Sequence, residues 1–145
     1  LIQFHFDEKW IYKDYIKKFT KIEPTESELI EFIKELTKNG NKLLITTGII
    51  LPNVLKEIKP TLDELNIKVY EGLSFTQLEK VTSKSSVLIS CHGAISHLAA
   101  AYNIKQIDII DKSYNYHKWT EHFRNYKSLH RVNFNNLSNR ILEML

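Results

Sequence analysis

Apolar residues are distributed along this chain in two alternating patterns. Short continuous apolar runs are typical of strands that are covered on both faces, and they lie at 1–6, 43–47, 67–70, 87–90 and 106–110. Between these runs, apolar residues recur every three or four positions, which is typical of helices with one buried face. The alternation predicts an α/β fold in which helices cover both faces of a parallel sheet.

Capping signals show where two of the helices begin. Thr25 with Glu28, and Ser74 with Gln77, have the spacing of a capping box. Asn39 and Gly40 then form a stop signal for the first of these helices. The apolar faces of the two helices consist of Leu29, Phe32, Ile33 and Leu36, and of Leu78 and Val81.

The remaining elements follow from similar signals. A helix from Asn53 has a regular apolar face, but Pro60 lacks an N–H group and should divide it in two. After a small-residue helix over 94–103 and the strand at 106–110, we expect a polar and aromatic loop over 111–127. A last strand is predicted at 131–134 and a closing helix at 137–145.

Composition supports a single globular domain over 1–145. Hydrophobic residues make up 43% of the chain and charged residues 26%, as in ordinary soluble domains. We therefore expect a Rossmann-like, doubly wound sheet of about six strands, with the strand at 87–90 near its middle. Because the chain begins within a strand, we also expect it to be part of a longer protein.

Charge and cysteine content limit which partners and which cellular compartment we expect for the protein. The net charge of +3 is mild, and basic and acidic residues are interleaved, so nucleic acid is not an expected partner. The one cysteine excludes an internal disulfide framework and fits a reducing cytoplasm. No signal peptide or membrane-length apolar run is visible. A basic edge would still favour anionic lipid, so a peripheral position at the inner membrane face stays open.

The segment after the strand at 87–90 is the main candidate site. Gly93 forms a sharp turn from the strand into the helix, and the N–H groups of Ala94, Ile95 and Ser96 follow it. Free N–H groups and the helix dipole attract phosphate at such a terminus. The absence of a Cβ at Gly93 allows close approach of an anion. Together with the preceding His92, these residues form a predicted phosphate site.

Two further side chains are predicted to join this site. His97 lies one turn into the helix, and helical side chains lean toward the N-terminus, so its imidazole could donate to phosphate. Lys9 follows the first strand at the same carboxyl edge and could neutralise phosphate as a point charge. The alternatives are a histidine that only packs locally and a solvated surface lysine. Trp10 is expected to pack its loop against the sheet.

The sequence contains weaker signals for a metal site and for a nucleophilic cysteine. Cys91, His92 and His97 lack paired ligand spacing, so no metal and no cofactor are predicted. Cys91 beside His92 is a poor nucleophile pair, because adjacent turn residues rarely face each other and no Asn or Asp stands by to orient the imidazole. The aromatic stretch with His117 and His122 is interpreted as an ordinary surface loop.

These residues carry a family resemblance. The run from Ser90 to Ala101 resembles the signature of glycosyltransferase family 9, the bacterial heptosyltransferases, in its Gly-x-x-His-x-Ala core. Glu8-Lys9-Trp10 resembles the family's Lys-Trp segment, and Glu71-Gly72-Leu73 with Gln77-Leu78 resembles its Gly-x-x-x-Leu-x-x-Leu stretch. The chain departs from the family pattern where an acid and a hydroxyl residue precede the glycine, since Cys91 and His92 stand there.

The resemblance implies the C-terminal, donor-binding half of a two-domain GT-B enzyme. Such a domain binds a nucleotide-diphosphate sugar for inverting transfer to a glycan or lipopolysaccharide-type, lipid-linked acceptor. The general base would come from an N-terminal acceptor-binding domain, so the catalytic residues are unknown here and the isolated domain is expected to be inactive. Two alternatives remain: a non-catalytic Rossmann or flavodoxin-like binding module, and half of a nucleotide-sugar epimerase.

Overall fold

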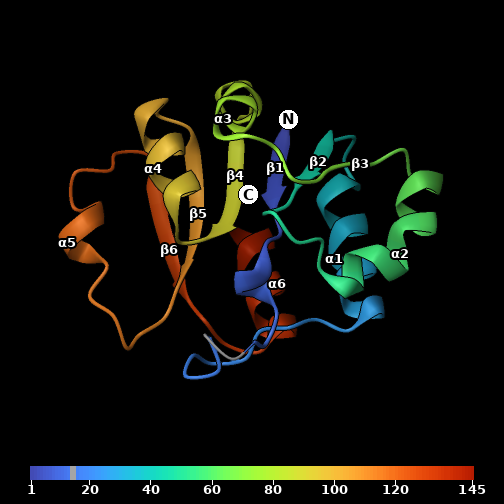
Figure 1. The fold of residues 1–145 in the computed structure, drawn as a ribbon, viewed down its shortest axis with the longest axis horizontal. Coiled ribbons are helices and arrows are strands. Elements are labelled where there is room, and N and C mark those ends of the chain that lie inside the picture. The colour runs from blue at the N-terminus through green and yellow to red at the C-terminus, as the bar shows by residue number, and fades with distance from the viewer. Residues whose placement is uncertain (14–15) are drawn as a thin grey trace.

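A parallel six-stranded sheet forms the centre of the protein, in the order β3-β2-β1-β4-β5-β6. The computed structural model describes residues 1–13 and 16–145. Figure 1 shows β1 and β4 side by side in the middle of the sheet. The expected doubly wound α/β fold is confirmed. The strands are β1 Ile2–His5, β2 Leu43–Thr46, β3 Lys68–Tyr70, β4 Val87–Cys91, β5 Lys105–Ile110 and β6 Tyr126–His130.

Helices cover both faces of this sheet. The larger core lies where α1, α2 and α6 pack on one face, and a smaller core lies beneath α3 and α4 on the other. Both predicted capping boxes are present, at Thr25 and at Ser74. A short 3-10 turn, η1, spans Glu8–Trp10. The helices are α1 Glu26–Thr37, α2 Asn53–Glu64, α3 Phe75–Ser83, α4 Ala94–Ala101, α5 His117–Thr120 and α6 Phe134–Met144.

An aromatic cluster anchors the loop after β1 to the larger core. Trp10 is fully buried, stacks on Phe6 and meets the rings of Phe4 and Phe134 edge-on. Its indole N–H donates to the carbonyl of His5 at 2.9 Å, so its one polar atom is satisfied. The expectation that Trp10 packs the loop against the sheet is confirmed, and the loop that carries Lys9 is thereby fixed.

Three expected boundaries are wrong. The helix α2 is continuous through Pro60, whose ring lies on the exposed side, so only one backbone hydrogen bond is lost there. The last strand spans 126–130 rather than 131–134, because an edge strand with exposed residues needs no apolar run. The closing helix begins at Phe134, and the Asn133 side chain caps it by accepting from the Asn136 N–H group.

The two tryptophans allow a matched test of this anchoring. Trp10→Ala should lower the free energy of unfolding by about 3–5 kcal/mol, because it leaves a cavity in an aromatic core. Trp119→Ala should change it by less than about 0.5 kcal/mol, since that side chain is 47% exposed. Urea denaturation followed by circular dichroism measures both. Trp10→Phe, which keeps most of the packing, should fall between them; equal losses for both alanine variants would contradict the account.

Candidate functional site

The candidate site lies where the winding of the sheet reverses. From β1 the chain continues outward through β2 and β3 on one side, and through β4, β5 and β6 on the other. Open α/β sheets bind ligands at the carboxyl ends of the strands at such a reversal. Two turns meet at this point: Asp7 to Trp10 follows β1, and His92 to Gly93 joins β4 to α4.

Lys9 and Gly93 lie against each other across this point. A Cβ atom added to Gly93 would stand 2.8 Å from Lys9 Nζ. The φ angle of Gly93 is 179°, which any residue can adopt, so the glycine provides space rather than an unusual conformation. The space above the start of α4 is therefore bounded by the Lys9 ammonium group, and the structure brings Lys9 and Gly93 together.

Asp7 fixes the position of Lys9. Its Oδ2 atom accepts from Lys9 Nζ at 2.9 Å, and its Oδ1 atom accepts from the Lys9 backbone N–H at 3.1 Å. Burial alone would raise the pKa of Asp7, but hydrogen bonding to His5 and the charge of Lys9 outweigh it and lower that pKa. Burial would lower the pKa of Lys9, and the Asp7 carboxylate reverses this and raises it. Both groups therefore stay charged at neutral pH.

A series of contacts between buried polar side chains leads to Asp7. Gln3 Nε2 donates to Thr46 Oγ1 at 3.1 Å, and Thr46 Oγ1 lies 2.8 Å from His5 Nδ1. The other ring nitrogen of His5, Nε2, lies 3.6 Å from Asp7 Oδ2. The carboxylate is thus held between His5 and Lys9.

A second carboxylate, Asp108 on β5, orients the residues around α4. It is fully buried and accepts from His92 Nδ1 at 2.6 Å, from Ser96 Oγ at 3.0 Å and from the Tyr126 hydroxyl at 2.7 Å. Burial and the Asp108 charge raise the pKa of Tyr126, which keeps its hydroxyl protonated. The expectation that no Asp or Asn orients the His92 imidazole is wrong. Asp108 is distant in sequence and reaches His92 from the neighbouring strand.

The network leaves His92 Nε2 without a hydrogen-bond partner among the described residues. The His92 side chain is mostly buried, and its ring meets those of His97 and Tyr116 edge-on, at centroid distances of 5.6 and 4.9 Å. Hydrogen bonding through Nδ1 fixes the orientation of the ring and leaves Nε2 for a ligand. Asp–His pairs of this kind place imidazoles for proton transfer or for hydrogen bonding to anions.

The backbone at the start of α4 is only partly available to a ligand. The Gly93 N–H donates to Ser96 Oγ at 3.2 Å, and the Ser96 N–H donates to the Gly93 carbonyl at 3.0 Å. Within residues 1–13 and 16–145, no acceptor is present for the N–H groups of Ala94 and Ile95. Ser96 therefore stabilises the turn, whereas Ala94 and Ile95 offer donors to an anion.

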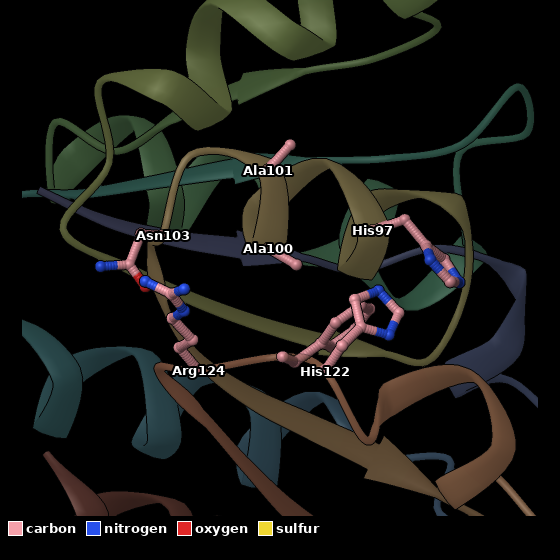
Figure 2. Close-up of a pocket in the computed structure, with 7 residues that line it drawn as sticks. His97, Ala100, Ala101, Asn103, His122 and Arg124 are labelled. Carbon is pink, nitrogen blue, oxygen red and sulfur yellow. The ribbon is translucent and has the colours of Figure 1, made fainter.

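His97 lies on the flank of α4 rather than over its N-terminus. Its side chain is exposed and meets Phe123 edge-on at 5.2 Å. Burial, and then the neighbouring His92 and His122, lower the pKa of His97 and favour its neutral form. Figure 2 shows the His97 ring at one end of a groove, close to the ring of His122.

Arg131 is a structural residue that the sequence did not indicate. It is buried just beyond β6, where its Nη1 atom donates to the Lys9 carbonyl at 2.8 Å and its Nε atom to the Thr20 carbonyl at 3.0 Å. It also faces Cys91, whose pKa burial raises well above the usual value. The Cys91 thiol is thus a buried neutral group. Arg131 holds the loop of Lys9 through the Lys9 carbonyl, whereas Asp7 holds it through the N–H group and the ammonium.

Across the part of the chain that the structure describes, no three His, Cys, Asp or Glu side chains converge in an arrangement that could hold a metal ion. In the same residues, no helix has both the length and the apolar character needed to cross a bilayer.

Known proteins resemble this chain in structure rather than in sequence. No family model and no curated protein matches it. One similar solved structure is the E. coli heptosyltransferase WaaC with ADP-2-deoxy-2-fluoro heptose, with a TM-score of 0.61 and 17% identity. The match covers 99% of this chain and 42% of WaaC, so the chain spans less than half the length of that protein. At this identity the likeness shows the fold: a Rossmann-like α/β unit such as forms half of a GT-B glycosyltransferase.

Proposed function

We propose that this chain is the nucleotide-sugar-binding domain of a glycosyltransferase of the heptosyltransferase type. One observation carries the proposal: Lys9 Nζ borders the space over Gly93, where the N–H groups of Ala94 and Ile95 are free. A lysine ammonium beside a helix N-terminus is suited to the diphosphate of a nucleotide sugar. The likeness in fold to WaaC, which was solved with an ADP-sugar, adds support.

The proposed chemistry concerns the leaving group. Cleavage of the bond between a sugar and its nucleoside diphosphate builds negative charge on the phosphate. Lys9, the N–H groups of Ala94 and Ile95, and the dipole of α4 would stabilise that charge without reorganising. Because Asp7 and Trp10 hold the loop of Lys9 in place, these groups are already positioned before the donor binds.

His92 is proposed as the third phosphate ligand. Its Nδ1 atom is committed to Asp108, so only Nε2 can meet a substrate. A doubly protonated imidazole would donate from Nε2 to a phosphate oxygen, and this charge-assisted hydrogen bond is stronger than a neutral one. His92 stands where the family has a hydroxyl residue, and Cys91 stands where the family has an acid. In this chain the carboxylate of the site is proposed to come from Asp108 on the neighbouring strand. Ser96 acts by positioning the turn, and His97 by packing beside His92.

The rest of the enzyme is proposed from the same resemblance. The acceptor, a glycan or lipid-linked sugar of the lipopolysaccharide type, would bind mainly to an N-terminal domain. That domain would supply the base that deprotonates the attacking hydroxyl. The chain by itself would then bind the donor without transferring its sugar. A cytoplasmic position, with or without peripheral contact to the membrane, belongs to this proposal.

Replacing Lys9 should weaken nucleoside diphosphate binding. We expect Lys9→Met to raise the Kd for the best ligand among ADP, UDP and GDP by about tenfold, the effect of losing a hydrogen bond to a charged group. The effect should shrink as salt rises, because a partly exposed ammonium is screened. Isothermal titration calorimetry in low and high salt measures both.

Lys34→Met on the exposed side of α1 is the matched control, and it should leave the Kd unchanged. Melting curves check that Lys9→Met stays folded, because that variant leaves Asp7 without its cation. Equal Kd values for the two variants would contradict the site. Binding that a chelator abolishes would indicate a metal-dependent site instead.

Adding a methyl group at Gly93 tests the space itself. The extended backbone accepts alanine, and the new Cβ would meet only the flexible end of Lys9, so Gly93→Ala should fold normally. It would occupy the volume proposed for phosphate and displace the ammonium. We expect at least a tenfold rise in Kd with a melting temperature within about 3 °C of the parent. Unchanged binding by a folded Gly93→Ala protein would remove phosphate from this position.

A further inference from the structure

A groove along the flank of α4 is separate from the space over Gly93. It lies between α4 and residues 122–124, which precede β6, and encloses about 450 Å³. This volume is within the range of small-molecule sites in proteins. The sequence does not predict this groove, because His122 and Arg124 belong to a stretch whose pattern is typical of an ordinary surface loop.

The groove gathers groups that carry or can carry positive charge. His97, His122 and Arg124 line it, and none of its lining residues is acidic. Figure 2 shows the two imidazoles near each other and Arg124 beside Asn103 at the other end. Arg124 makes no ion pair within residues 1–13 and 16–145, and the nearby Glu121 lies 3.6 Å from His117 instead.

Packed rings hold the two imidazoles in place. Phe123 meets His97, His122 and Tyr126 edge-on, at centroid distances of 5.2, 5.0 and 5.3 Å. At the other end, Asn125 Nδ2 donates to the Asn103 carbonyl at 3.3 Å, which joins the two walls. Groups that would repel one another when protonated are thus kept together in an open groove. This is typical of sites that bind a ligand of opposite charge.

The far end of the groove is too distant for one diphosphate to contact both it and Lys9. Gly93 precedes the eight residues of α4, and Asn103, beside Arg124 (Figure 2), follows them, so that end of the groove is about 12 Å of helix away. A diphosphate is shorter than that, whereas His97, at the near end, lies one turn into the helix. His92 and His97 lie between the two regions with their rings in contact. Two anionic groups could therefore occupy the two regions at the same time.

We propose that this groove is a second anion-binding site, which takes a phosphate or carboxylate group on the acceptor substrate. The assignment to the acceptor rests on the proposed function, in which the donor diphosphate occupies the space beside Lys9. The presence of an anion site in the groove rests only on His97, His122 and Arg124. A bound anion would offset the mutual repulsion of the imidazoles and accept hydrogen bonds from Arg124.

The direct test is a titration of the chain with inorganic phosphate, followed by the side-chain ¹⁵N NMR signals of its histidines and arginines. Signals of His97, His122 and Arg124 should shift together with one Kd. Arg124→Gln and His122→Gln should each raise that Kd by about threefold or more. Arg140→Gln, on the exposed side of α6 across the sheet, is the matched control and should leave it unchanged.

Two further arms separate this site from the first and identify its source. Lys9→Met should leave the groove Kd within about twofold, since Arg124, beside Asn103 (Figure 2), lies at the end of the groove farther from Gly93. Saturating nucleoside diphosphate should not displace phosphate from the groove. Absence of groove shifts, or an equal loss in Arg140→Gln, would overturn the anion site. Displacement by the nucleoside diphosphate would overturn the assignment to the acceptor. If no nucleoside diphosphate binds, the proposal of a donor site is wrong, whereas the phosphate titration still tests whether the groove binds an anion.

Discussion

The ion pair between the buried Asp7 carboxylate and the partly exposed Lys9 ammonium is the constraint on which the candidate site depends. A lysine on a loop would ordinarily sample many rotamers, and ordering it on binding would reduce affinity. Here the carboxylate holds both the backbone and the ammonium of Lys9, while Trp10 anchors the next residue in the core. Burying the carboxylate is tolerated because His5 and Lys9 both face it. The ammonium is therefore fixed beside Gly93 in the absence of a ligand.

Asp108 has the corresponding role on the α4 side of the site, where the winding of the sheet reverses. One buried carboxylate ties together β5, the turn before α4 and Tyr126 on β6. Three hydrogen bonds satisfy its charge, and they fix which face His92 can offer. The two carboxylates thus prepare the two flanks of one space, Lys9 on one side and His92 on the other. Both carboxylates are buried, so they act on a ligand through Lys9 and His92 rather than by contact.

The sequence predicted those features that depend on local pattern. The apolar runs placed the first five strands, and the spacing of Thr25 with Glu28 marked a helix start that the structure confirms. The sequence also predicts that Lys9 and Gly93 lie at the same edge of the sheet, because each lies just beyond the end of a strand and parallel strands end at one edge; the structure brings the two residues together there. The sequence did not predict features that depend on residues far apart in the chain. Asp108 contacts His92 across 16 positions, and Arg131 contacts Lys9 across 122. The last strand was misplaced because edge strands need no apolar run.

A crystal structure of the chain with its best-binding nucleoside diphosphate tests the central claim most directly. The account predicts a phosphate group over Gly93, within hydrogen-bond distance of Lys9 Nζ and of the N–H groups of Ala94 and Ile95. It also predicts that the Asp7–Lys9 pair stays in its present geometry, because the site is already formed. A phosphate bound elsewhere, with the space over Gly93 filled by water, would contradict the account.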